Sequence, residues 1–306
     1  MQRDAMLKPI DAIAQAGLGR RRFLAQAGIL GMGTAAAAFT LGARPAFAET
    51  DSAAEAEQER EQAKDTVKEI FTAALIAEDL ATTFYYNSLI GPVIQDPNLA
   101  GPGGSATNIT AAGNAGNVNY IQAALSEEIA HANLFRTLLG GSAASGDPAQ
   151  TFYFPAGSFD TLANFTGLLN ALEDAFIGAY LNAIQEFATK AADVRWDGGG
   201  WWHHDQDGSK YSAEELDYFS KVSASIMGIE AEHRVLGRVI SNTNPANNLA
   251  YEQTDGLNAV YNGPNSAVAA LTPFLTASTG PGYSLATALA NQSTVSLPVT
   301  GGPPAF

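Results

Sequence analysis

The sequence predicts an all-α protein: a four-helix bundle with a long crossover between helices 2 and 3 and a mostly irregular C-terminal extension. Four segments carry apolar residues at the helical period of about 3.6 residues. The segments between them are rich in Gly, Asn, Pro and Asp, which favour turns. In addition, 46% of the 306 residues are hydrophobic, so the chain can bury a core and is not a disordered protein.

The first 48 residues have the profile of an export signal. Three arginines at residues 20–22 precede an uncharged stretch, residues 23–43, and the small-residue motif Ala-Phe-Ala follows at residues 46–48. The order Arg-Arg-x-Phe-Leu resembles the twin-arginine signal, although Gly19 and Ala25 depart from its usual residues. A membrane anchor is the alternative, but the glycines, threonines and glutamine of this stretch favour cleavage. We therefore expect a periplasmic or secreted protein without a stable membrane span after cleavage.

The next 194 residues, 49–242, contain the four predicted helices. The first helix is expected over residues 51–90, where a charged stretch leads into an apolar stripe. A Gly/Asn/Thr loop follows, and the second stripe covers residues 121–138 and stops at two glycines. A segment without helical period then forms the crossover to the third stripe, residues 162–187. The fourth helix opens at a capping box, Ser-Ala-Glu-Glu at residues 212–215, and continues to residue 240.

Residues 243–306 differ in composition from the bundle. They are rich in Asn, Pro, Gly, Thr and Ser, with short apolar clusters at residues 268–275 and 285–290. We expect a C-terminal extension with short helices packed on the bundle, followed by a Pro/Gly tail.

Charge and cysteine content exclude several classes of function. The chain has 16 Lys and Arg against 31 Asp and Glu, a net charge of -15 that repels a phosphate backbone, so nucleic acid is not an expected partner. It has no cysteine, which excludes thiol nucleophiles and thiolate metal sites. Any metal must be held by carboxylate, imidazole or carbonyl groups.

A glutamate interrupts each of the four apolar stripes at a position where the helical period calls for a core residue. The second and fourth glutamates are each followed three residues later by a histidine, which projects from nearly the same face of the helix. The residues are Glu78, Glu128, His131, Glu173, Glu230 and His233.

Buried carboxylates cost several kcal/mol each unless a proton, a cation or a hydrogen-bond network compensates them. No cationic residue lies on these stripes, because Arg136, Arg234 and Arg238 fall beside them. Four ionised glutamates are neutralised by two divalent ions, and oxygen and nitrogen ligands suit iron(II) and manganese(II), while zinc would also accept them. The sequence therefore predicts a site for two divalent metal ions, Fe or Mn. In the alternative, these side chains face solvent or pair with one another.

The order Glu, Glu-x-x-His, Glu, Glu-x-x-His over four helices resembles the ferritin-like di-iron and di-manganese carboxylate proteins. The resemblance covers about residues 51–242, and Pro-Ala-Asn-Asn-Leu-Ala-Tyr-Glu at residues 245–252 is similar to exported bacterial ferritin-like proteins related to desiccation-related proteins. It implies that each histidine completes one metal position. It also implies that Glu78 and Glu173 are the more terminal ligands and that Glu128 and Glu230 bridge the two metals.

The resemblance implies reaction of O2 or peroxide at the metal pair, or iron redox chemistry. An enzyme of this kind would be a ferroxidase-like or manganese-catalase-like oxidoreductase, and a structural or vestigial metal site stays open as well. The alternative function is that of a non-catalytic metal-binding stress protein. Iron storage in a shell is disfavoured because a cage subunit does not need a long C-terminal extension, while oligomer formation stays open.

Several residues near the predicted ligands have two readings. Tyr85 and Tyr180 lie seven residues after Glu78 and Glu173, where they would relay electrons or, as we favour, pack in the core with a satisfied hydroxyl. Four acidic residues close to the ligands in sequence are expected on the solvated face or against the ligands from outside: Asp79, Glu127, Asp174 and Glu232.

The loop before the fourth helix carries a weak calcium-loop match. A polar connector whose Asp and Ser residues cap the fourth helix is the favoured reading. Trp201 and Trp202 are expected to plug one end of the bundle rather than to form a partner surface. The five residues that match the calcium-loop template are His203, Asp205, Asp207, Gly208 and Glu214.

Overall fold

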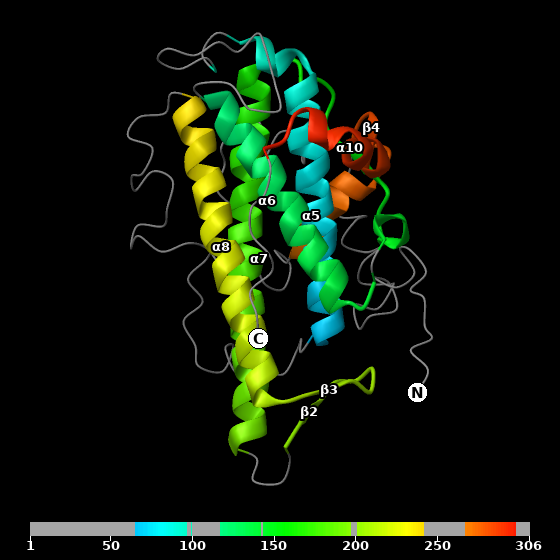
Figure 1. Cartoon of the computed structure of the whole chain (residues 1–306), viewed down its shortest axis with the longest axis vertical. Helices are drawn as coiled ribbons and strands as arrows, with labels where there is room; N and C mark the ends of the chain where they lie inside the picture. Colours follow the sequence, from blue (N-terminus) through cyan, green and yellow to red (C-terminus); the bar gives the residue numbers. More distant parts are fainter. Residues whose placement is uncertain are drawn as a thin grey trace.

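The computed structural model describes residues 65–96, 99, 117–141, 143–196, 201–241 and 267–297. Four long helices form a bundle in this part of the chain: α5 (Val67–Ile90), α6 (Asn117–Leu138), α7 (Leu162–Trp196) and α8 (Ala213–Ile240). Figure 1 shows α6 and α7 running in the same direction, so the connection between them crosses the length of the bundle. None of the described helices is long and apolar enough to span a bilayer. The expected export signal lies outside the described residues.

The helix ends follow local capping chemistry. Helix α5 begins at Val67 because the Thr66 hydroxyl accepts a hydrogen bond from the Glu69 backbone N–H, and the Glu69 carboxylate accepts one from Thr66 in return. The prediction of one unbroken helix over residues 51–90 is therefore wrong at its start, while residues 51–64 lie outside the described part. The predicted capping box of the fourth helix is confirmed at Ser212 and Glu215.

Helix α6 ends as the sequence predicts. Gly140 adopts a φ of 75°, which glycine reaches without steric cost, and its N–H donates to the Thr137 carbonyl. Helix α7 extends nine residues beyond the predicted stripe, because the segment after residue 187 contains three alanines, a lysine and an arginine and no Gly or Pro up to Trp196.

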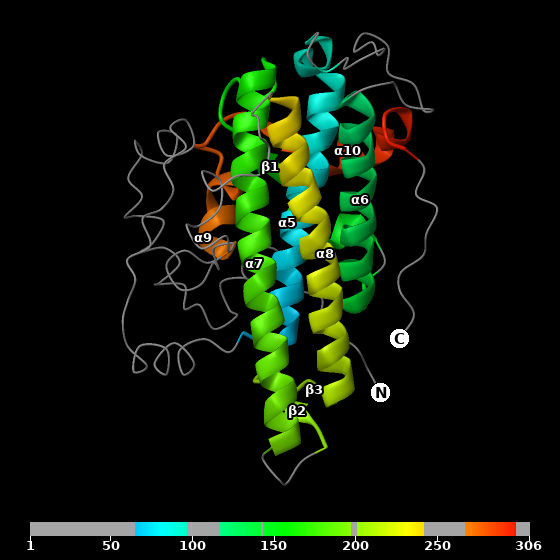
Figure 2. The ribbon, with the colours of Figure 1, turned by 90° about the vertical axis from the view of Figure 1, so that its left-hand side faces the viewer.

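The crossover and the C-terminal extension are joined by a short sheet. Strand β1 (Thr151–Tyr153) pairs antiparallel with β4 (Gly282–Ser284), with Phe152 opposite Tyr283. The extension also contains α9 (Ala267–Leu271) and α10 (Leu285–Asn291), which contact α7 and α5 respectively. Figures 1 and 2 show these segments lying on the outside of the four long helices. The predicted short helices of the extension are thus present, and the sheet is an addition that the sequence did not predict.

Two apolar clusters fill the bundle. One surrounds Phe84 and Phe165 and includes Phe154 from the crossover and Leu285 from the extension. The other surrounds Phe71 and includes residues of all four long helices near the opposite end. Polar residues at the middle of each helix therefore lie between these two apolar clusters.

A buried ion pair fixes the loop before α8. Lys190, which is only 2% exposed, places its Nζ 3.0 Å from Asp205 Oδ1, and Asp205 Oδ2 accepts a hydrogen bond of 2.8 Å from the Val67 backbone N–H. Asp205 therefore caps α5, not the fourth helix. It belongs to a hairpin formed by β2 (His203–His204) and β3 (Lys210–Tyr211).

The structure supports neither the calcium-loop match of this loop nor the plug expected of its tryptophans. The carboxylates of the calcium-loop match have other partners: Asp205 forms an ion pair with Lys190, and Asp207 accepts a hydrogen bond from the Ser209 backbone N–H within the turn. The expectation that the two tryptophans plug the bundle is wrong, since Trp201 is 88% exposed and Trp202 50%.

Replacement of Gly280 by Ala should destabilise the contact between the crossover and the extension. A Cβ atom at this position would lie 1.9 Å from the Phe154 carbonyl oxygen, so the backbone would have to move. We expect the free energy of unfolding to fall by about 1–3 kcal/mol, measured by urea denaturation. Gly146→Ala is the matched control, because nothing lies within 4 Å of its added Cβ. An equal effect of both substitutions would contradict this account.

Candidate metal centre

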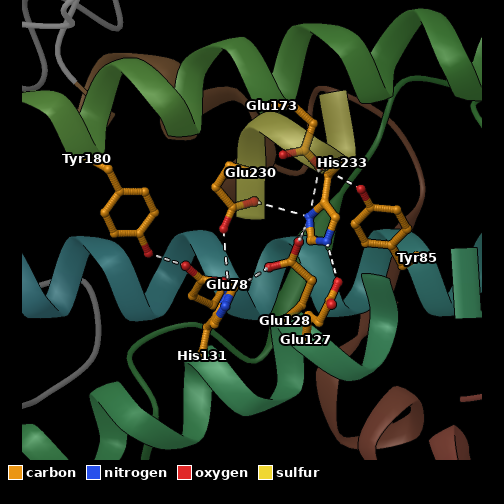
Figure 3. Close-up of polar contacts among 9 residues, drawn as sticks. All are labelled: Glu78, Tyr85, Glu127, Glu128, His131, Glu173, Tyr180, Glu230 and His233. Atoms are coloured by element: carbon orange, nitrogen blue, oxygen red, sulfur yellow. Dashed lines mark hydrogen bonds and ion pairs between the residues drawn. The ribbon is translucent and has the colours of Figure 1, made fainter. Parts of the chain in front are cut away.

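The six predicted site residues converge at the middle of the bundle. Figure 3 shows them projecting inward from all four long helices. Their ligand atoms form two groups in which all atoms lie within 4.8 Å of one another. One group contains Glu78, Glu128, His131 and Glu230, and the other contains Glu128, Glu173, Glu230 and His233.

Two glutamates belong to both groups. Glu128 and Glu230 lie between the two histidines, while Glu78 and Glu173 each belong to one group only. The geometry therefore separates two shared carboxylates from two outer ones, the arrangement that bridging and terminal ligands of a metal pair require.

Both imidazoles present their Nδ1 atoms to these carboxylates. His131 Nδ1 lies 3.2 Å from Glu78 Oε2 and 3.5 Å from Glu230 Oε1. His233 Nδ1 lies 3.0 Å from Glu128 Oε1 and 3.3 Å from Glu230 Oε2. Each group thus offers one nitrogen and several oxygens at one place, a donor set suited to iron or manganese.

Several carboxylate oxygens of the site are buried and accept no hydrogen bond. Both oxygens of Glu128 and one each of Glu173 and Glu230 are in this state. Buried oxygens of this kind cost free energy unless a proton or a cation compensates them. The residues present therefore fit a cation between them.

Burial and mutual repulsion perturb the acid–base properties of the site. Burial raises the pKa of Glu78 and of Glu173 well above 4.5, and the neighbouring carboxylates add to the effect. Burial acts in the same direction on Glu128, but the two imidazoles outweigh it and hold the pKa of Glu128 well below its usual value. For both histidines, the nearby carboxylates overcome burial and raise the pKa well above 6.5.

Two tyrosines connect the ends of the site across the bundle. The Tyr85 hydroxyl, on α5, donates a hydrogen bond of 2.6 Å to Glu173 Oε1 on α7. The Tyr180 hydroxyl, on α7, donates to Glu78 Oε1 on α5 (Figure 3). Both side chains are buried, so the favoured reading of core tyrosines with satisfied hydroxyls is confirmed. These bonds also hold the two outer glutamates in place.

Two buried arginines near the site, Arg136 and Arg234, form ion pairs with aspartates. Asp79, next to Glu78, pairs with Arg136, whose Nε lies 2.7 Å from Asp147 Oδ2. Arg234 pairs with Asp174 at 2.9 Å. Within the described ranges, no arginine or lysine forms an ion pair with the four glutamates. The positive charge that the glutamates need is therefore not provided by these side chains.

Glu127 takes the second of the two positions expected for it, against a predicted ligand from outside. Its Oε2 lies 2.8 Å from His233 Nε2, on the side of the imidazole that faces away from the site. The sequence grouped it with three other acidic residues, of which Asp79 and Asp174 pair with arginines and Glu232 is exposed. The only sequence signal for this contact is that Glu127 directly precedes the predicted ligand Glu128 on α6, whereas His233 lies on α8.

The stability of the metal-free protein should fall as the pH rises above 6.5. The folded-state pKa values of Glu78, Glu173 and both histidines are raised, so their contribution to stability is complete below the unfolded-state values and is lost as the pH passes the folded-state ones. The lowered pKa of Glu128 makes stability rise with pH instead, but this change takes place only at acidic pH, so it does not alter the slope above pH 6.5. Thermal unfolding of metal-free protein between pH 6.5 and about 9 measures this slope.

Mn(II) should reverse this trend, because carboxylates and imidazoles bind metal only after losing their protons. The stabilisation by added Mn(II) should therefore increase with pH over the same range. Glu173→Gln removes one of the titrating groups and should reduce the slope of the metal-free protein. A melting temperature of the metal-free protein that rises with pH would refute the assignment of these protons.

Comparison with known proteins agrees with this geometry. Residues 66–194 match a family described as ferritin-like domain. Neither a curated protein nor a solved structure matches the chain. The matched residues cover α5, α6 and most of α7, and the structure adds Glu230 and His233 from α8 to the same place. The family match over residues 66–194, the helical bundle and the order of acidic residues and histidines on four helices together support assignment of this part of the chain to the ferritin-like superfamily.

Proposed function

We propose that this protein is an exported ferritin-like metal protein that holds two divalent ions, Fe or Mn, and acts in O2 or peroxide reduction or in iron oxidation. The observation that carries the proposal is the pair of overlapping ligand groups that share Glu128 and Glu230. Four buried carboxylate oxygens in these groups accept no hydrogen bond, and a cation between them would compensate their charge.

Each residue of the site has a definite task in this proposal. Glu78 and His131 would hold one ion, Glu173 and His233 the other, with Glu128 and Glu230 between them. Bound iron or manganese would supply the change of valence that reduction of O2 or peroxide needs. Tyr85 and Tyr180 donate hydrogen bonds to the outer glutamates and limit their movement.

The surroundings favour a protected reaction site. The ligands lie between two apolar clusters, which keep bulk water away from the carboxylates and strengthen their attraction for a cation. His131, 13% exposed, is the most accessible of the six, whereas Glu128 is fully buried. Small molecules such as O2 or peroxide would therefore approach from the His131 side.

Export by the twin-arginine route is the second part of the proposal. Its support is the arginine motif at residues 20–24 and the uncharged stretch that follows. This route carries folded proteins, so the metal ions would be bound before the protein crosses the membrane.

Metal analysis of the purified protein tests the ligand assignment. We expect about two Fe or Mn ions per chain, one for each ligand group. Glu128→Ala removes an oxygen donor from both groups and should abolish most of this content, whereas His131→Ala should remove about half. Glu232→Ala, an exposed position on α8, is the control and should keep the full content. Unchanged metal content in the two site variants would overturn the assignment.

An oxidant assay then separates the functional classes. Fe(II) oxidation with O2 uptake indicates a ferroxidase-like enzyme, and O2 release from peroxide by the manganese form indicates a catalase-like one. A fully loaded protein that consumes neither oxidant contradicts the redox proposal. It would leave the non-catalytic metal-binding stress protein, whose support is the sequence at residues 245–252.

A further inference from the structure

The two halves of the site have equivalent ligands. Helices α5 and α6 supply Glu78, Glu128 and His131, and α7 and α8 supply Glu173, Glu230 and His233. The two tyrosines are equivalent in the same way: Tyr85 on α5 donates a hydrogen bond to Glu173 on α7, and Tyr180 on α7 donates one to Glu78 on α5. Each residue of one half therefore has a counterpart in the other, and any difference between the metal positions must come from outside the ligands.

Glu127 breaks this equivalence. It lies directly before Glu128, and its carboxylate contacts Nε2 of His233 at 2.8 Å. The residue directly before Glu230 is Ile229, which has no hydrogen-bonding side chain. Among the described residues, Nε2 of His131 has no hydrogen-bond partner, and His131 is 13% exposed where His233 is 4%.

The contact with Glu127 determines which nitrogen of His233 carries the proton. A carboxylate accepts a hydrogen bond, so in the neutral imidazole that binds a metal Nε2 carries the hydrogen and the lone pair is on Nδ1, which faces Glu128 and Glu230. The negative charge of Glu127 also makes Nδ1 a stronger donor to a cation. His131 has neither advantage from the residues that the structure describes, because none of them fixes its tautomer and ring orientation from the outer side.

We propose that the two metal positions are unequal: the position completed by His233 fills first and binds more tightly, with Glu127 as its positioning residue. This inference rests on the proposed metal site. The loss of such an outer carboxylate typically lowers metal affinity by about 10- to 100-fold, which sets the size of the expected difference.

Calorimetric titration of the metal-free protein with Mn(II) at pH 7 tests the inequality. We expect two binding steps of different affinity. Glu127→Gln should weaken the tighter step by about 10-fold or more and leave the weaker one unchanged, because the amide keeps the size of the side chain and removes its charge. Glu232→Gln makes the same charge change at an exposed position of α8 and should alter neither step. An equal change in both steps, or none, would overturn the proposal.

Crystals of the wild-type protein with one equivalent of Mn(II) identify the position that fills first. The anomalous scattering peak should lie beside His233 and Glu173. A peak of equal or greater height beside His131 and Glu78 would overturn the proposed order while leaving the metal centre itself intact. Wild-type protein that binds no Mn(II), Fe(II) or Zn(II) would instead refute the proposed function, so the two failures are distinguishable.

Discussion

The structure depends on one electrostatic constraint: four carboxylates occupy the core of a helical bundle, where water cannot solvate them. Glu78, Glu128, Glu173 and Glu230 are each at most 2% exposed, and apolar clusters lie on both sides of them. Their mutual repulsion must be cancelled locally, because the cost of an uncompensated buried charge is comparable to the stability of a whole domain. Two histidines and two tyrosine hydroxyls are their hydrogen-bonding and charged neighbours in the described part of the chain, and these leave several oxygens without a partner.

The arrangement of the other charges is consistent with this constraint. The buried arginines near the site are paired with Asp79, Asp147 and Asp174. The pairs with Asp79 and Asp174 connect neighbouring helices, and the pair with Asp147 connects α6 to the crossover, without neutralising the glutamates. Lys190 and Asp205 make a comparable buried pair at the end of the bundle, where they hold the hairpin β2–β3 against α5. These arginines and this lysine therefore stabilise the frame, and compensation of the four glutamates is left to protons, to the two histidines or to a bound cation.

Most of the fold could be predicted from the sequence because its determinants are local. Apolar stripes at the helical period located all four helices, and a glutamate within a stripe is visible without knowledge of the partner helix. The start of α5 was predicted too early, although the pair Thr66 and Glu69 is a capping box that marks it. The strands β1 and β4 have three residues each and lie about 130 positions apart, so neither alternation nor proximity in sequence reveals them.

The contacts around the ligands were harder to predict than the ligands. A single step along a helix is a rotation of about 100°, so Glu127 points away from the face of Glu128, and only the position of α8 brings His233 to it. The exposure of Trp201 and Trp202 likewise depends on how a short hairpin leaves the bundle. Both cases require the relative placement of segments that the sequence specifies only through the complete fold.

The position of Phe154 has a consequence for biosynthesis. This crossover residue packs against Phe274 and Tyr283. Its carbonyl oxygen lies so close to Gly280 that any side chain at position 280 would clash with it. A chain that emerges from the ribosome N-terminus first makes all four long helices before these partners are available. One wall of the apolar cluster around Phe84 therefore stays open until residues 274–285 have been translated, and the bundle reaches its final packing only after its fourth helix is complete.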